Sequence, residues 1–177
     1  FNADISTCNT SRVTNMERMF EGASTFNQNI ITQLAIDSSG IPVTDSSGNT
    51  YIAWDVSKVT NMQRMFCGAW AFNQNIGNWD VGNVNTMSVM FAGTPWGVNI
   101  FNQDIGGWNV SKVRDMQHMF DRCYFNQDIG NWNVGNVTTM NAMFMNQNRP
   151  TRTPPVYGFN QDIGNWNVSN VLVMSNM

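Results

Sequence analysis

One pattern of apolar residues returns six times along this chain, and it constrains the fold more than any other feature. Its most regular copy is FNQDIGGWNVSKVRDMQHMF, residues 101–120. The apolar positions of this copy are Phe101, Ile105, Trp108, Val110, Val113, Met116, Met119 and Phe120. Self-similarity with a period of about 20–50 residues is typical of supersecondary units that stack on their neighbours. The pattern therefore predicts a stack of coils rather than a globule around a single core.

Each repeat begins at a phenylalanine. The six starts lie near Phe1, Phe26, Phe72, Phe101, Phe125 and Phe159. They are 25, 46, 29, 24 and 34 residues apart, so the bare repeat has 24 or 25 residues. The excess falls in three inserts, 31–51, 94–100 and 146–158, where a stacked repeat tolerates insertion. We predict a single repeat array over 1–177. Repeat six stops at Met177 with its apolar positions uncovered, so we expect the array to be a fragment of a longer chain.

The spacing inside a repeat predicts one strand and one helical turn. Trp108 and Val110 are two residues apart, so both point to one face of a short strand. Ser111 is a good helix N-cap, and the apolar residues after it come at steps of three, three and one. The predicted fold is an α/β repeat solenoid of about six coils, similar to a leucine-rich repeat. Short parallel strands would form one face, and short helical or 3-10 turns the other.

Aromatic and sulfur-containing residues are concentrated at the repeat positions. The tryptophans predicted to form an inner column, the structural core, are Trp54, Trp79, Trp108, Trp132 and Trp166. Repeat one has Cys8 at this place. All 11 phenylalanines and all but one of the 13 methionines also hold repeat positions. This placement indicates that they fill the stack, rather than forming a metal or cofactor site.

Charge excludes several classes of partner. Charged residues make up 12% of the chain, about half the usual share, and the formal net charge is −3. This balance gives no electrostatic case for binding nucleic acid or an anionic membrane. No run approaches the roughly 18 apolar residues of a membrane-spanning helix. We therefore expect no nucleic-acid partner and no membrane-spanning segment.

Residues that carry catalysis or bind metal ions are sparse. His118 is the only histidine, and the three cysteines, Cys8, Cys67 and Cys123, form no CxxC pair. Stacking would hold Cys67 and Cys123 roughly 10 Å apart, too far for a disulfide. Neither a catalytic triad nor a zinc quartet can be assembled from these residues. We predict no enzyme activity, no cofactor, no metal site and unpaired cysteines.

The fourth position of each repeat is acidic or an amide. Its members are Asp4, Asn29, Asn75, Asp104, Asp128 and Asp162. Stacked oxygens of this kind could form a calcium ladder, since hard cations prefer such ligands. Alternatively each side chain could accept a hydrogen bond from its own turn. We favour the second interpretation because the repeat lacks the density of acidic residues found in a dedicated calcium loop.

The repeat resembles a known family. FNQDIGNWNVGNVTTM with its following Met-Phe pair, residues 125–144, is similar to the repeat of about 26 residues of bacterial surface lipoproteins, grouped with the BspA-like leucine-rich-repeat proteins. The resemblance covers the chain apart from the three inserts. It implies an extracellular or cell-surface location and an adhesive function, with a possible lipid anchor outside this fragment. Relatives in large viruses make a virion surface the alternative location. No catalytic residues come with the family.

The candidate interaction surface combines the outward side chains of the predicted strands with aromatic residues of the inserts. Its members are Asn78, Asp80, Asn131, Asn133, Asn165, Asn167, Trp96 and Tyr157. The first hypothesis is a non-catalytic adhesion module that binds protein or glycan on another surface. The alternative is a structural subunit of a filament, sheath or virion-surface assembly, which would bind copies of itself.

Overall fold

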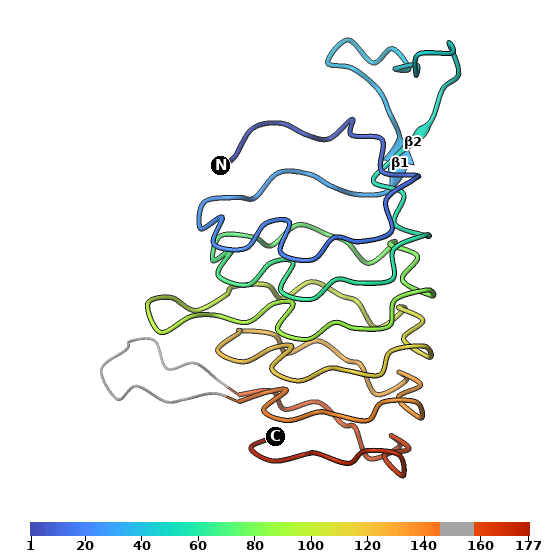
Figure 1. Cartoon of the computed structure of the whole chain (residues 1–177). Coiled ribbons are helices and arrows are strands. Elements are labelled where there is room, and N and C mark those ends of the chain that lie inside the picture. Colours follow the sequence, from blue (N-terminus) through green and yellow to red (C-terminus); the bar gives the residue numbers. More distant parts are fainter. Residues whose placement is uncertain (146–157) are drawn as a thin grey trace.

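The computed structural model describes residues 1–145 and 158–177, and Figure 1 shows the chain winding through stacked levels from one terminus to the other. Neighbouring levels are joined by isolated parallel β-bridges that form a column along the stack. The bridged pairs are Asn15–Asn61, Asn61–Thr86, Thr86–Asp115, Asp115–Thr139 and Thr139–Val173. Each bridge joins one repeat to the next along the sequence, so packing is between sequence neighbours.

The segment after each bridge is a chain of β-turns. In repeat four the amide of Met119 donates to the carbonyl of Met116 at 3.2 Å. The amide of Asp121 closes the next turn on the carbonyl of His118, also at 3.2 Å. The His118 amide itself donates to the carbonyl of Asn141 in repeat five at 2.8 Å. Along this segment, amides that close a turn within the repeat therefore alternate with amides that donate to a carbonyl of the next repeat.

The predicted α/β solenoid with leucine-rich-repeat-like coils is wrong. The described residues contain no helix, and their only strands are β1 (Gln33–Leu34) and β2 (Ile52–Ala53), which pair antiparallel. The helical prediction failed at residues such as His118, whose φ is 53°. A left-handed residue is what a type II turn requires at its third position, and it prevents consecutive turns from continuing into a helix. The three-residue apolar step came from these turns.

The predicted parallel strands are also wrong, because the chain turns a corner where a strand was expected. Asn109 Oδ1 accepts the amide hydrogen of Ser111 at 3.2 Å, forming an Asx turn. The amide of Val113 then donates to the carbonyl of Val110 at 2.9 Å. Ser111 is therefore a turn residue and not a helix N-cap. Trp108 still points inward with Val110, which is why the alternation resembled a strand.

Stacked rings fill the interior. The 11 phenylalanines form one double file. Phe91 and Phe101 lie 4.0 Å apart between ring centroids, and Phe91 and Phe120, one level apart, lie 5.7 Å apart. A second file consists of five of the seven tryptophans, with Trp108 and Trp132 stacked at 6.5 Å and 3° from parallel. Offset ring pairs at these distances add to the stability gained from burial alone.

The tryptophan file also joins neighbouring repeats by hydrogen bonds. Trp108 Nε1 donates to the carbonyl of Ile76 at 3.1 Å, and Trp132 Nε1 donates to that of Ile105 at 3.1 Å. The other tryptophans with this bond to the preceding repeat are Trp54, Trp79 and Trp166. All five are buried. Leaving a buried N–H donor unpaired costs about 1–3 kcal/mol. Any other distance between neighbouring repeats would break the indole bond, so the bond favours the spacing that is observed.

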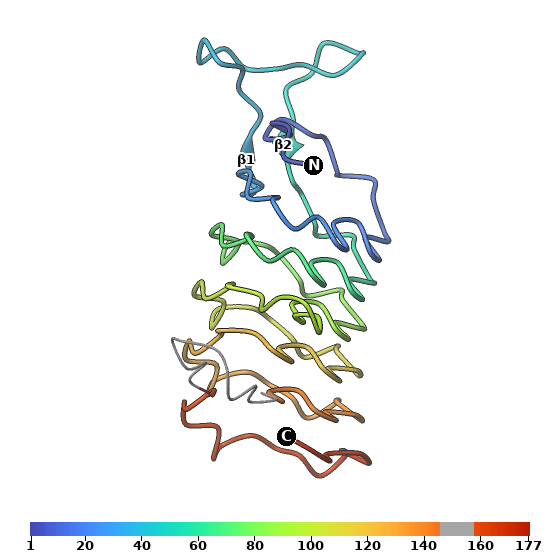
Figure 2. The same cartoon turned by 90° about the vertical axis from the view of Figure 1, so that its left-hand side faces the viewer.

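Residues 31–51 form an arm that projects from the N-terminal end of the stack (Figures 1 and 2). At its base β1 and β2 pair Gln33 with Ala53 and Leu34 with Ile52. The next pair outward is joined by the amide of Ala35, which donates to the carbonyl of Tyr51 at 3.0 Å.

The outer part of the arm consists of two loops of one design. Asp37 Oδ1 accepts the amides of Ser39 and Ile41 at 2.8 and 2.9 Å. Asp45 Oδ1 makes the same two bonds eight residues later. Both loops have a left-handed glycine, with φ of 78° and 80°. The insert 31–51 thus contains two tight hairpins, for which the duplicated Asp-Ser-Ser-Gly was a signal in the sequence.

Candidate functional site

The acidic column consists of Asx turns. Asp104 Oδ1 accepts the amide hydrogen of Gly106 at 2.9 Å. The residues that make the same bond two positions ahead are Asp4, Asn29, Asn75, Asp128 and Asp162. The turn interpretation of this column is therefore confirmed. In the described part of the chain, no group of three or more His, Cys, Asp or Glu residues is placed to hold a metal ion.

The outward amide and carboxylate face is exposed, but the stack uses many of its polar groups. The six residues of this face, all exposed, are Asn78, Asp80, Asn131, Asn133, Asn165 and Asn167. Asn78 Nδ2 donates to the carbonyl of Thr32 at 2.8 Å. Oδ1 of Asp80, Asn133 and Asn167 accepts the amide two residues ahead at 3.0–3.2 Å. A ligand would have to compete with these intramolecular bonds, which weakens the case for this face.

A second surface lies where the insert 94–100 leaves the stack. We call it the insert corner, and it comprises residues 94–100 with Trp70, His118 and Asp121–Tyr124. The insert is a tight turn in which the Thr94 amide donates to the Gly97 carbonyl at 2.7 Å, and the Gly97 amide donates back at 3.2 Å. Trp96 lies within this turn and is 80% exposed. The turn therefore presents a large aromatic ring to solvent.

Buried contacts fix this turn to the stack. A β-carbon on Gly97 would lie 2.2 Å from Cε2 of Trp70, so the ring packs directly on the glycine backbone. Asn99 is fully buried, and its Nδ2 donates to the carbonyl of Phe66 at 3.0 Å. The Asn99 amide also donates to the carbonyl of Arg122 at 3.1 Å. Asn99 and Trp70 were not predicted as anchors, because neither belongs to the repeat pattern.

A charged group lies against the base of the same insert. The amide of Gly93 donates to the carbonyl of Asp121 at 2.8 Å, which places Asp121 next to the start of the insert. Asp121 Oδ2 lies 3.2 Å from His118 Nδ1 and 3.4 Å from Arg122 Nη1, and the Asp121 side chain is only 7% exposed. Burying a carboxylate is costly unless it has hydrogen-bonding or charged partners of this kind. His118, the only histidine of the chain, is half-buried in this group.

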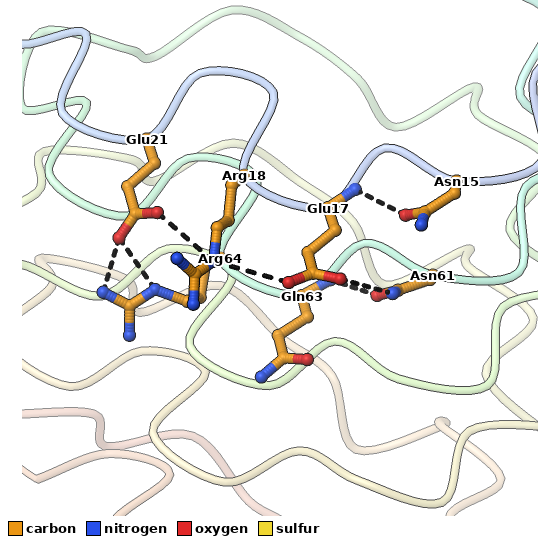
Figure 3. Close-up of polar contacts among 7 residues, drawn as sticks. All are labelled: Asn15, Glu17, Arg18, Glu21, Asn61, Gln63 and Arg64. Carbon is orange, nitrogen blue, oxygen red and sulfur yellow. Dashed lines mark hydrogen bonds and ion pairs between the residues drawn. The ribbon is translucent and has the colours of Figure 1, made fainter.

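A larger ionic network joins repeats one and two on the same edge of the stack (Figure 3). Arg64 Nε donates to Glu21 Oε1 at 2.7 Å, and Arg18 Nε lies 3.6 Å from Glu21 Oε2 and 3.4 Å from Glu17 Oε1. Asn61 Nδ2 extends the network to Glu17 at 3.2 Å. Arg18 and Arg64 both have φ of 58°, like His118 in repeat four. These partly exposed pairs order the edge and contribute little net stability.

The cysteines are free, and the two buried ones are poor nucleophiles. Burial raises the pKa of Cys123 to about 12. Burial also raises the pKa of Cys67. Cys8 is exposed at the N-terminal end. Since the thiolate is the reactive form, neither buried cysteine is suited to catalysis or thiol exchange near neutral pH.

Of the two aromatic residues predicted for the interaction surface, Trp96 is on the insert corner, whereas Tyr157 lies outside the described residues. No part of 1–145 or 158–177 forms a helix with the length and apolarity needed to cross a bilayer.

Comparison with known proteins gives one family. The family model described as "Mycoplasma protein of unknown function, DUF285" matches residues 1–39, 43–153 and 99–177. No curated protein and no solved structure matches the chain.

Proposed function

We propose that this chain, which belongs to the family described as Mycoplasma protein of unknown function, DUF285, is a non-catalytic adhesion or interaction module displayed on a surface. The resemblance of its repeats to those of BspA-like surface lipoproteins supports an extracellular or cell-surface location, with a virion surface as the alternative. In this proposal the stack is a scaffold, and the insert corner binds protein or glycan on an opposing surface.

The exposed ring of Trp96 is the observation that carries the proposal. The five tryptophans of the file are buried, and Trp70 packs on Gly97. Trp96, in contrast, leaves 80% of its surface in water. Burying such a ring against a partner releases about 25 cal/mol per Å² of apolar area, and tryptophan is among the residues most often found at binding hot spots.

The rigidity of the insert adds to this argument. Binding requires the loss of conformational freedom at the interface, which lowers affinity for mobile loops. Here the turn closes on itself through Thr94 and Gly97, and Asn99 fixes its return to the stack. The insert is therefore already ordered before a partner binds, so binding loses less conformational entropy than it would with a mobile loop. This arrangement is typical of an aromatic anchor.

A binding assay with two matched variants tests the proposal. The 177-residue protein would be titrated onto a printed array of glycans, and onto intact cells before and after protease or glycosidase treatment. We expect saturable binding that Trp96→Ala weakens at least tenfold. Leu172→Ala is the control, because Leu172 is 84% exposed but lies on the lateral surface of repeat six. Binding that persists within twofold in Trp96→Ala would contradict the assignment to the insert corner. An absence of binding to every probe would contradict the adhesive function.

A further inference from the structure

Four tripeptides of the form Asn-x-Ser/Thr, in which x is not proline, occur in the chain. They begin at Asn9, Asn109, Asn136 and Asn167. This tripeptide is the acceptor of N-linked glycosylation, which attaches a bulky sugar to Nδ2 and therefore needs an exposed asparagine. All four asparagines are exposed. They nevertheless fall into two groups, because the stack uses their side-chain amides in different ways.

At three of these sites the side chain bonds only through its oxygen. Asn109 Oδ1 accepts the amide hydrogen of Ser111 at 3.2 Å, and Asn167 makes the same bond two positions ahead. Asn9 Oδ1 accepts both the amide and the hydroxyl of Ser11, at 3.2 and 2.7 Å. In the described part of the chain, no acceptor lies within hydrogen-bond distance of Nδ2 of these three residues. The atom that a sugar would modify is therefore not used by the fold.

The preceding repeat leaves space beside two of these nitrogens. A β-carbon on Gly82 would lie 3.4 Å from Asn109 Nδ2, and one on Gly135 would lie 3.7 Å from Asn167 Nδ2. Other repeats have a serine at this place, such as Ser57. Because glycine has no side chain, the preceding repeat does not cover either nitrogen from this position.

Asn136 uses its side-chain nitrogen to join two repeats. Its Nδ2 donates to the carbonyl of Ser111 in the preceding repeat at 2.8 Å. Asn83 and Asn170 hold the same place in their own repeats and make the same bond at 2.8 and 2.7 Å. A sugar bonded to Asn136 Nδ2 would crowd a carbonyl oxygen that lies only 2.8 Å from this atom. Modification of Asn136 thus opposes the stack, whereas modification of the other three asparagines does not.

We propose that Asn9, Asn109 and Asn167 are sites of N-linked glycosylation and that Asn136 is not. The donor is a sugar activated as a glycosyl diphosphate. Nδ2 forms a bond to the anomeric carbon of the sugar and gives up one proton. The bond from that carbon to the diphosphate oxygen breaks, and the diphosphate leaves with the electron pair. The hydrogen bond from each Oδ1 to its turn is kept in the product, because it does not involve Nδ2.

The three sites hold the same place in repeats one, four and six, directly after Cys8, Trp108 and Trp166. Asn167 belongs to the outward amide and carboxylate face, and Asn9 and Asn109 hold the equivalent position of their repeats. Sugars would therefore cover a face whose polar groups are already largely engaged within the stack. The inference rests on the proposed surface location and not on binding at the insert corner.

Glycopeptide mass spectrometry tests the proposal. The 177-residue protein would be secreted from a eukaryotic cell line behind a cleavable signal peptide, and the folded fraction would be purified and digested. We expect sugar on Asn9, Asn109 and Asn167, and at least tenfold lower occupancy of Asn136. Ser111→Ala should abolish the modification of Asn109, and the conservative variant Ser111→Thr should retain it.

A gain-of-site variant tests the importance of the turn. Asn133 Oδ1 accepts the amide of Gly135 at 3.2 Å, in the geometry of the proposed sites, but no hydroxyl follows it. Gly135→Ser supplies this hydroxyl and should create a fourth glycosylated asparagine at position 133.

Protein from the natural source is the final test, and its Asn109 and Asn167 peptides should carry sugar. The proposal is overturned if these peptides are unmodified there or in the secreted protein. It is also overturned if Asn136 is modified as fully as Asn109, or if Gly135→Ser leaves Asn133 unmodified. These results are independent of the Trp96→Ala binding assay, so failure of one proposal is distinguishable from failure of the other.

Discussion

Replacing Trp108 by alanine should destabilise the protein by about 3–5 kcal/mol. The side chain is only 4% exposed, and its ring is stacked with those of Phe91 and Trp132, each 6.5 Å away between centroids. Emptying a buried aromatic site costs this much because contacts are lost and the cavity closes only partly. The carbonyl of Ile76 also loses its 3.1 Å bond to the indole. That loss adds about 1 kcal/mol, which moves the expected value to the upper half of the range.

Calorimetry and urea denaturation would measure this loss. For a chain of this length, about 3–5 kcal/mol corresponds to a fall in Tm of roughly 6–20 °C. Trp108→Phe helps to separate the two contributions, because it keeps an aromatic ring in the file and removes the N–H donor together with a smaller part of the buried ring. Its cost should be about 1–2 kcal/mol.

Trp96→Ala is the matched control on the surface. Because Trp96 is 80% exposed, its replacement should change the free energy of unfolding by less than about 0.5 kcal/mol. Equal losses for Trp108→Ala and Trp96→Ala would refute the argument that the tryptophan file is a main source of stability.

Three further predictions concern local features of the stack and of the arm. Gly106→Ala should lower the free energy of unfolding by about 1–3 kcal/mol in urea denaturation, because the added β-carbon would lie 2.6 Å from the Asp128 carbonyl oxygen. Gly107→Ala is the matched control: its β-carbon would meet nothing within 4 Å, so it should be neutral or stabilising by up to about 1 kcal/mol. Burial raises the pKa of Asp115, so its ionised form is disfavoured in the folded state and stability falls as pH rises through that pKa. Asp115→Asn should therefore raise Tm at pH 7 and leave it unchanged at pH 3. Replacing residues 36–50 of the arm by Asn-Gly should change the unfolding free energy by less than about 1 kcal/mol, because Ala35 and Tyr51, which are joined by a hydrogen bond next to the strand pair, can be connected by a two-residue hairpin turn.

The repeat and its buried positions could be recognised from spacing alone. Residues that recur at fixed intervals, such as Phe101 and Trp108, are buried because stacking places like residues in one file. The Asx turns of the fourth position were also predicted, since Asp and Asn accept amides two residues ahead. These features depend on local chemistry and on repetition, both of which are visible in the sequence.

The backbone conformation between these positions could not be predicted in the same way. A three-residue apolar step is shared by a 3-10 helix and by consecutive β-turns, so the pattern does not distinguish them. The deciding feature is a left-handed residue, and the chain places Arg18, Val89 and His118 there rather than glycine. Because non-glycine residues seldom adopt this conformation, it could not be foreseen at these positions. The inter-repeat hydrogen bonds compensate for the strain.

The candidate site was identified only in part. Trp96 was selected because inserts are the least repetitive surface, but its exposure could not be known in advance. The anchors of the insert, Trp70 and Asn99, act through contacts with Gly97 and the Phe66 carbonyl, which are distant in sequence. Such contacts are specific to one insert and leave no periodic signal. The two hairpins of the arm did leave a periodic signal in the sequence, because Asp37 and Asp45 begin the same four-residue motif.

The central structural claim is that consecutive β-turns are hydrogen-bonded from one repeat to the next, and the fixed position of Trp96 depends on this stack. NMR couplings through hydrogen bonds test the claim most directly. The structure predicts a coupling between the amide nitrogen of His118 and the carbonyl carbon of Asn141, across a bond of 2.8 Å. It predicts a second coupling from the Met119 amide to the carbonyl of Met116. A helix would instead couple the His118 amide to the carbonyl of Arg114, four residues earlier. Observing that coupling, with none to Asn141, would contradict the chain of β-turns and the stack built from it.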